Sequence, residues 1–105
     1  MTKKPKISFM TWDEFERLNF ENQPENLRAF LNVAIEEYMA DGNKAAFMDA
    51  LAVVAKWAGV GKVAGKGGLT RQGVYKALRP GARPAFTTVL DILHGAGFSL
   101  KVVKG

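Results

Sequence analysis

The 105-residue chain contains no cysteine, and this absence excludes several kinds of site. Without thiols there can be no disulfide framework, no thiolate metal site and no cysteine nucleophile. The single histidine, His94, cannot supply the four nitrogen or sulfur ligands that a structural zinc site uses. We therefore expect neither a metal nor another cofactor.

Long apolar runs are absent as well. The longest apolar stretch, residues 50–65, is interrupted by Lys56 and Lys62, and it is too short and too charged to span a bilayer. The basic first six residues are not followed by the apolar run of a secretory signal. With 48% hydrophobic and 24% charged residues, the composition is that of a folded domain. We expect a small, soluble, cytoplasmic protein.

Acidic residues are nearly absent from the second half of the chain. Residues 1–55 carry nine Asp or Glu and six Lys or Arg, whereas residues 56–105 carry nine Lys or Arg and one acid, Asp91. The net charges of −3 and +8 indicate two surfaces with different partners. Lys and Arg also solvate faces that bind nothing, and composition agrees with both interpretations. The ratio of nine cations to one acid favours attraction to a polyanion such as nucleic acid.

Residue arrangements that carry catalysis are missing too. Residues 65–66 resemble the Gly-Lys of a phosphate-binding loop, but Val60 stands at the first glycine position and Gly67 at the Ser/Thr position. Glu36 and Glu37 are adjacent, so on a helix they point about 100° apart and do not form a pair of catalytic carboxylates. We therefore expect a binding protein rather than an enzyme.

The first half of the chain predicts three helices. A capping box at residues 11–14, with threonine and glutamate at its ends, opens a short helix over 12–19. Residues 24–42, bounded by a proline and a glycine, predict a second helix. Residues 43–59 predict a third, with an asparagine cap at its start and a glycine at its end.

The second half predicts two more helices and a strand. Five glycines fall within residues 59–68, and those at 61, 65 and 67 each cost about 1 kcal/mol of helix stability relative to alanine, so we expect this stretch to be loose or irregular at its end. Helices are predicted over 69–78 and from 86 to the glycines at 95 or 97, with a Pro/Gly loop at 79–84 between them. Residues 98–103 alternate apolar and polar side chains at first, which predicts a half-buried strand.

Residues 60–79 have the spacing of a helix-turn-helix. Ala64 supplies a small residue where the first helix crosses the second, Gly68 tolerates the positive φ of the turn, and Val74 faces back into the crossing. Thr70 can cap the second helix. The apolar seam between the two helices is completed by Val63, Leu69 and Leu78 (or Ala77).

The predicted fold class is therefore all-α, a five-helix bundle that contains a helix-turn-helix and ends in a short C-terminal β-strand. The expected domain organisation is an N-terminal tail and short helix over residues 1–22, followed by a single helical domain over 23–105.

Three segments resemble the addiction-module antidote proteins: residues 68–78 (GLTRQGVYKAL), 84–93 (PAFTTVLDIL) and 97–102 (GFSLKV). Those proteins form a HigA-like branch of the phage-repressor (XRE/Cro-type) helix-turn-helix superfamily. The resemblance implies an antitoxin of a type II toxin–antitoxin module. Such an antitoxin binds and neutralises a small RelE/ParE-type toxin encoded beside it. It also represses its own operon by binding a palindromic operator in double-stranded DNA as a dimer.

The resemblance also implies roles for individual residues. Thr70, Arg71 and Gln72 would open a recognition helix at phosphates and base edges, where Arg71 can fork onto guanine and Gln72 onto adenine. Tyr75 and Lys76 would face the same groove one turn later. The remaining contacts would be to backbone phosphates, from Lys62, Lys66, Arg79 and Arg83.

Two alternatives to this interpretation stay open at the level of sequence. One is a free-standing phage-type transcriptional regulator, which shares the DNA chemistry but has no toxin. The other is an antidote that acts only by protein–protein binding. The predicted strand over 98–103 would leave its backbone groups unpaired if it were alone, which predicts a homodimer through this strand or pairing with the toxin.

Overall fold

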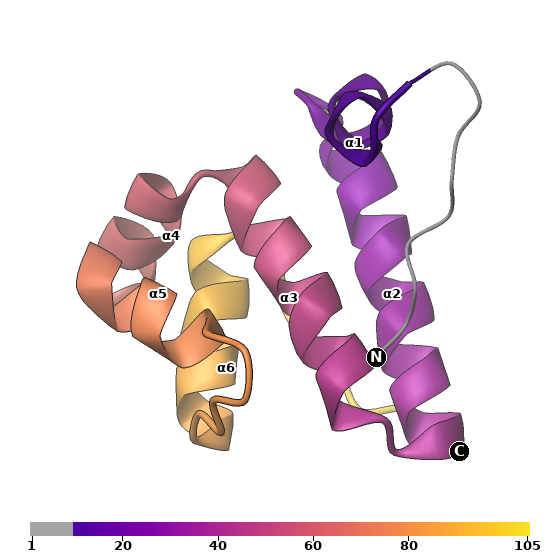
Figure 1. The fold of residues 1–105 in the computed structure, drawn as a ribbon. Helices are drawn as coiled ribbons and strands as arrows, with labels where there is room; N and C mark the ends of the chain where they lie inside the picture. The colour runs from indigo at the N-terminus through magenta and orange to yellow at the C-terminus, as the bar shows by residue number, and fades with distance from the viewer. Residues whose placement is uncertain (1–9) are drawn as a thin grey trace.

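The computed structural model describes residues 10–105, and the N-terminal tail predicted at the start of the chain lies mostly outside them. The described part is all-helical, which confirms the predicted class. It contains six helices (Figure 1): α1 Trp12–Phe20, α2 Pro24–Asp41, α3 Lys44–Ala58, α4 Val60–Gly67, α5 Arg71–Leu78 and α6 Phe86–Gly95. Helices α2 and α3 pack side by side, and α1 lies across the N-terminal end of α2 (Figure 1). Helix α3 also contacts α4 and α5, and α4 in turn contacts α6.

Local capping explains where the first three helices begin and end. The Thr11 hydroxyl accepts from the N–H of Glu14 at 3.1 Å, and the Glu14 carboxylate accepts from the N–H of Thr11 at 2.8 Å, so the predicted capping box is confirmed. The second helix ends at Gly42, whose φ of 67° is left-handed, and the third is capped by Asn43. These signals act within four residues, which is why the sequence alone locates them.

The prediction of five helices is wrong, because the glycine-rich stretch forms a helix of its own. Gly59, with φ at 97°, separates α3 from α4, and α4 then runs for eight residues to Gly67. An isolated helix of this length and composition would be unstable in water. Packing against α6, α5 and α3 therefore outweighs the poor intrinsic helix propensity of α4.

Two glycines let α4 and α6 approach closely. A Cβ on Gly67 would overlap the backbone carbonyl of Asp91, and a Cβ on Gly95 would overlap the backbone carbonyl of Val63. Any larger residue at either position would force the two helices apart. These glycines are thus requirements of packing rather than signs of a loose helix.

The predicted C-terminal strand is also wrong, because residues 98–105 contain no strand. Helix α6 ends in a Schellman motif at Gly97, whose φ is 94°, and the N–H of Phe98 donates to the carbonyl of Leu93 at 2.9 Å. Phe98 is half-buried against the core, and the rest of the tail is exposed. A strand needs a neighbouring strand, and the described residues supply none.

The core is continuous from α1 to α6. Its central members are fully enclosed, with Leu51, Val54, Val63, Val74 and Ile92 at 0% exposure. The remaining buried members are Phe20, Leu27, Leu31, Ala55, Ala64, Leu93 and Ala96. This single core fixes α4 and α5 with respect to the helices that precede them.

A buried carboxylate ties α1 to the end of α3. Glu16 is only 1% exposed, and its Oε1 accepts from Trp57 Nε1 at 2.8 Å and from Lys56 Nζ at 3.4 Å. Lys56 Nζ also pairs with Asp13 at 3.1 Å, and that hydrogen bond raises the pKa of Lys56. This network fixes α1 against the last turn of α3, which directly precedes α4 in the chain.

Candidate nucleic-acid interface

Helices α4 and α5 are joined by a tight turn with well-defined ends. Gly68 adopts a left-handed φ of 72°, and the N–H of Leu69 donates to the carbonyl of Ala64 at 2.8 Å, which forms a second Schellman motif. The Thr70 hydroxyl then accepts from the N–H of Gly73 at 2.9 Å. Helix α5 therefore begins at Arg71, and the Thr70 hydroxyl serves as its N-terminal cap.

The residues predicted to form the seam between these helices face inward. Val63 and Val74 are 0% exposed and Ala64 is 4% exposed. Leu69 and Leu78 are half-buried and pack against the same core. The solvent-facing sides of α4 and α5 thus belong to a firmly packed unit.

Arg71 lies across the first turn of α4. A Cβ on Gly61 would come within 2.6 Å of Arg71 Nη2, so the guanidinium occupies the space that a side chain there would take. Gln72 is exposed beside it, and Tyr75, one turn later, is 61% exposed despite its aromatic ring. The start of α5 therefore presents a guanidinium, an amide and an aromatic ring to solvent.

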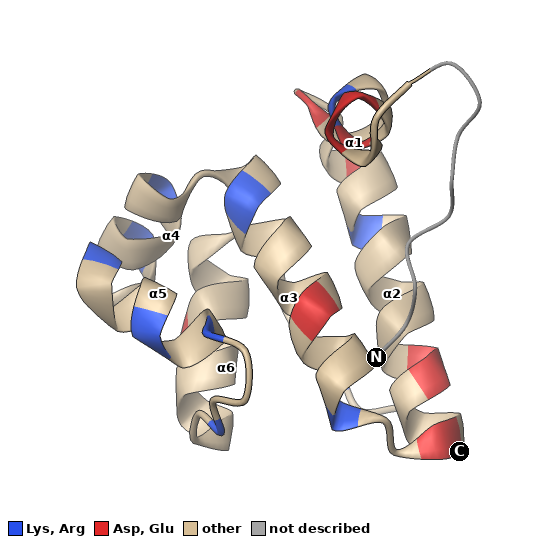
Figure 2. Cartoon of the chain, viewed as in Figure 1, with Lys and Arg blue, Asp and Glu red and all other residues tan. Residues whose placement is uncertain are grey.

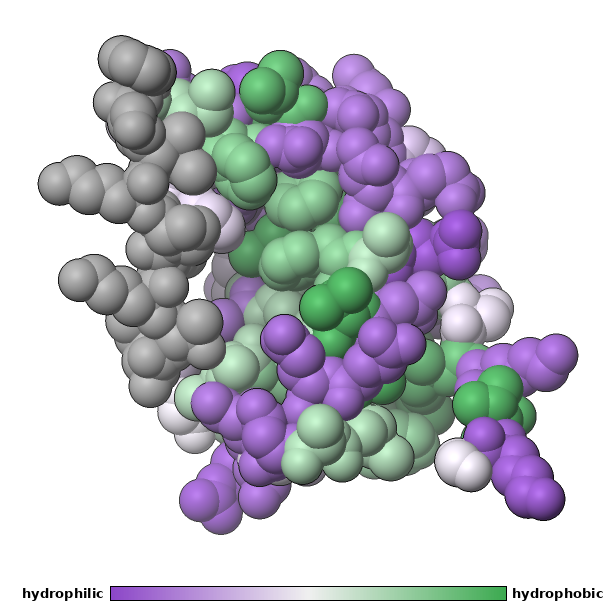
Figure 3. Space-filling view, turned by 90° about the vertical axis from the view of Figure 1, so that its right-hand side faces the viewer, coloured by the Kyte–Doolittle hydropathy of each residue, from purple (hydrophilic) through white to green (hydrophobic). Residues whose placement is uncertain are grey.

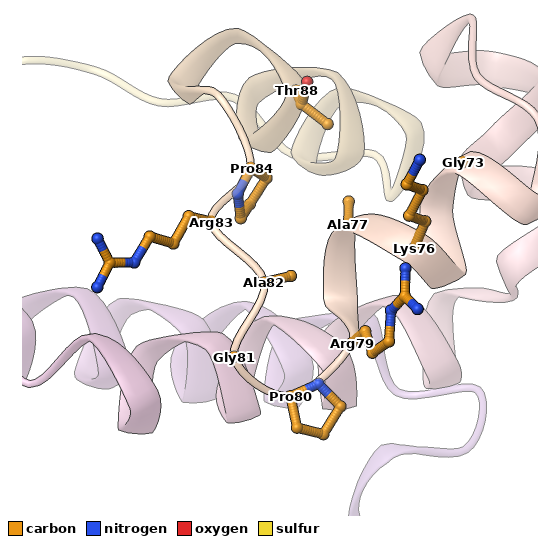
Figure 4. Close-up of a pocket in the computed structure, with 10 residues that line it drawn as sticks. All are labelled: Gly73, Lys76, Ala77, Arg79, Pro80, Gly81, Ala82, Arg83, Pro84 and Thr88. Atoms are coloured by element: carbon orange, nitrogen blue, oxygen red, sulfur yellow. The ribbon is translucent and has the colours of Figure 1, made fainter.

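A cationic hollow follows at the end of α5. Lys76 and Arg79 border it from α5 and the residue after it, and Arg83 borders it from the loop with its guanidinium pointing away from the other two (Figure 4). Its volume is about 510 Å³, and Pro80 and Pro84 shape the loop that forms one wall. Among residues 10–105, no acidic side chain lines the hollow. It is completed by the small or short side chains of Gly73, Ala77, Gly81, Ala82 and Thr88.

The segment from the start of α4 to the end of the loop carries positive charge that no acidic residue of the same segment neutralises. Residues 60–84 contain six Lys or Arg and no Asp or Glu. All six are exposed, and within residues 10–105 none of them forms a salt bridge. Figure 2 shows these cations on α4, α5 and the following loop, with most of the acidic residues on α1, α2 and α3. The members on α4 are Lys62 and Lys66, one turn apart.

Other kinds of site have no support in the described residues. Between residues 10 and 105, no three His, Cys, Asp or Glu side chains gather where they could hold a metal ion. The same residues include no helix that is long and apolar enough to cross a membrane.

Sequence reasoning missed two features of this interface. The contact of Arg71 with Gly61 depends on how α4 and α5 pack, although a glycine ten residues before an arginine is visible in the sequence. The hollow depends on the path of the Pro/Gly loop, and its signal is the run of small residues between Arg79 and Arg83.

Comparison with known proteins places this architecture in a family. The model of a family described as "probable addiction module antidote protein" matches residues 11–104, nearly the whole chain. The chain belongs to this antidote family. A protein of Haemophilus influenzae, described only as uncharacterized, is 28% identical to the antidote over 78 residues, which cover 74% of this chain and 76% of the relative. No solved structure matches the antidote.

Proposed function

We propose that this antidote is a DNA-binding antitoxin that neutralises a RelE/ParE-type toxin and represses its own operon in the cytoplasm. The observation that carries the DNA-binding half is the uncompensated charge of residues 60–84, with six exposed cations and no acid. A surface of this kind attracts a polyanion and releases its counterions. The resemblance to HigA-like helix-turn-helix repressors supports the same role. The proposal is one of binding, without catalysis.

The exposed start of α5 has the chemistry of direct base readout. Arg71 can donate two hydrogen bonds to guanine, and Gln72 can exchange two with adenine. Tyr75 and Lys76 follow on the same side of the helix one turn later. The Thr70 hydroxyl is used in capping α5, so the part of Thr70 that can lie near a phosphate is its backbone.

The cations around α5 would position the helix on the duplex. Lys62 and Lys66 on α4 would neutralise phosphates on one side, and Arg79 and Arg83 at the hollow would do so on the other. Helix α6 starts beside the hollow without a side-chain cap, so its first backbone N–H groups can receive a phosphate.

The C-terminal tail supports a dimer. Leu100, Val102 and Val103 are 47%, 97% and 75% exposed, on a segment whose base is fixed by the cap at Gly97. Pairing of residues 99–103, beyond the capped Phe98, with the same residues of a second copy would satisfy their backbone groups and cover these side chains. A two-fold dimer would present two α5 helices to half-sites about 34 Å apart in a palindromic operator.

The DNA-binding half is tested by the salt dependence of binding to the DNA upstream of this gene. Removing one phosphate contact with Lys66→Ala should lower the slope of log K against log salt by about one. Lys44→Ala removes the same charge from the start of α3, outside residues 60–84, and should leave the slope unchanged. Binding that does not vary with salt would overturn this half of the proposal.

A further inference from the structure

The outward side of α2 has no partner among the described residues, although much of it is apolar. On its inward side, helix α2 contacts α1 and α3 and buries Leu27 and Leu31. On the opposite side Ala29, Val33 and Ala40 are exposed, and Val33 is 51% exposed. Seen from the side of α2, apolar residues gather in the middle of the surface, and hydrophilic residues lie mainly above them and to their right (Figure 3).

The exposed residues of α2 form a regular seam. Ala29, Val33, Glu36 and Ala40 follow one another at spacings of four, three and four, which places them along one line of the helix. The two alanines are small enough to let another chain approach the helix closely. Met39, which is 78% exposed, flanks the line. Such a seam suits an apolar ridge of a partner.

The charge around the seam specifies the partner further. Residues 12–41 carry eight Asp or Glu and two Arg, and seven of these acids are exposed. The last turns of α2 contain Glu37 and Asp41 and no basic residue, although the negative end of the helix dipole favours cations there. Glu37 and Asp41 are repelled by the negative end of the dipole, and a cationic partner would offset this repulsion. DNA, which is an anion, would itself be repelled.

We propose that the outward face of α2, defined by Ala29, Val33, Glu36, Glu37 and Ala40, is the docking surface for the toxin. The partner it fits is a protein surface with an apolar ridge flanked by Lys or Arg. This inference rests on the antitoxin half of the proposed function. Because the face lies on α2 and the cations lie on α4, α5 and the loop, one molecule can hold toxin and DNA together.

The test uses the product of the gene adjacent to this one as the probe and measures its Kd. Val33→Asp puts a charge into the seam, and Glu37→Lys replaces attraction with repulsion, so each should weaken binding about tenfold or more. Glu37→Lys also places a cation four residues before Asp41, which favours the helix. Its melting temperature should equal or exceed that of the wild type, so lost binding would not reflect unfolding.

The matched control is Asp49→Lys, which makes the same change of charge at an exposed position of α3 outside the face. It should alter the Kd less than about twofold. If both α2 variants bind like the wild type, the docking surface is wrong and the antitoxin function stands. If the wild type itself does not bind the probe, the antitoxin half fails and this inference fails with it. If Val33→Asp converts a dimer to monomers in sedimentation, the face is a contact between copies, which also overturns the inference.

Discussion

The contact between α4 and α6 can be tested by a pair of glycine-to-alanine substitutions in one helix. Gly65 and Gly67 both lie in α4, two residues apart. Nothing lies within 4 Å of a Cβ on Gly65, whereas a Cβ on Gly67 would overlap the backbone carbonyl of Asp91. Both substitutions gain helix propensity and reduce the entropy of the unfolded chain. The difference between the two variants therefore isolates the cost of separating α4 from α6.

The expected magnitudes follow from that geometry. Gly65→Ala should raise the free energy of unfolding by about 0.5–1 kcal/mol. Gly67→Ala gains a similar term but overpacks a backbone–backbone contact, which costs about 1–3 kcal/mol. The two variants should thus differ by about 1–3 kcal/mol, or about 5 °C or more in melting temperature for a domain of this size.

The assay is thermal unfolding followed by far-ultraviolet circular dichroism, with urea unfolding as a second measure. Gly95→Ala should lower the melting temperature at least as much as Gly67→Ala, because its Cβ would overlap the backbone of Val63. Equal melting temperatures for Gly65→Ala and Gly67→Ala would refute the close packing of α4 on α6.

Three further predictions concern the tail and the first helix. Removing residues 100–105, which leaves the packed Phe98 in place, should give monomers in light scattering, and an unchanged mass would mean that another surface forms the dimer. Glu16→Ala leaves the Trp57 N–H without its acceptor and should cost about 2–4 kcal/mol in urea unfolding, whereas Glu16→Gln keeps an acceptor and should cost less; equal losses would contradict the role of that hydrogen bond. The hydrogen bond from the backbone N–H of Thr11 holds the pKa of Glu14 below its ordinary value of 4.5, so its contribution is present above pH 4.5 and is lost as the pH falls through the lower folded value. The stability difference between wild type and Glu14→Ala, which lacks the accepting carboxylate, should therefore shrink in acid, and a constant difference from pH 7 to pH 3 would contradict this.

The sequence locates the features that depend on neighbouring residues. The caps at Thr11, Gly42 and Gly68 follow from side-chain and backbone preferences over a few positions. The bounds of the second and third predicted helices likewise follow from the proline, the glycines and the asparagine at their ends.

The sequence alone does not locate features that depend on contacts between segments far apart in the chain. The stability of α4 comes from α6, so glycines that look unfavourable locally are required by the crossing. Glu16 looks like a surface acid, yet it shares one side of α1 with Trp12 and Phe20, and only the position of Trp57 explains its burial. The tail has the alternation of a strand, but the described residues contain no strand beside it.

In the function that we propose, the start of α5 reads the operator. The most direct measurement is a gel shift with the DNA upstream of this gene, comparing the wild type with Arg71→Ala/Gln72→Ala. The matched control, Arg28→Ala/Asn32→Ala, removes one guanidinium and one amide from exposed positions on α2. We expect a specific complex for wild type and control, and a loss of about a hundredfold or more in affinity for the α5 variant. Weak, salt-sensitive binding that is the same for all three proteins would contradict it.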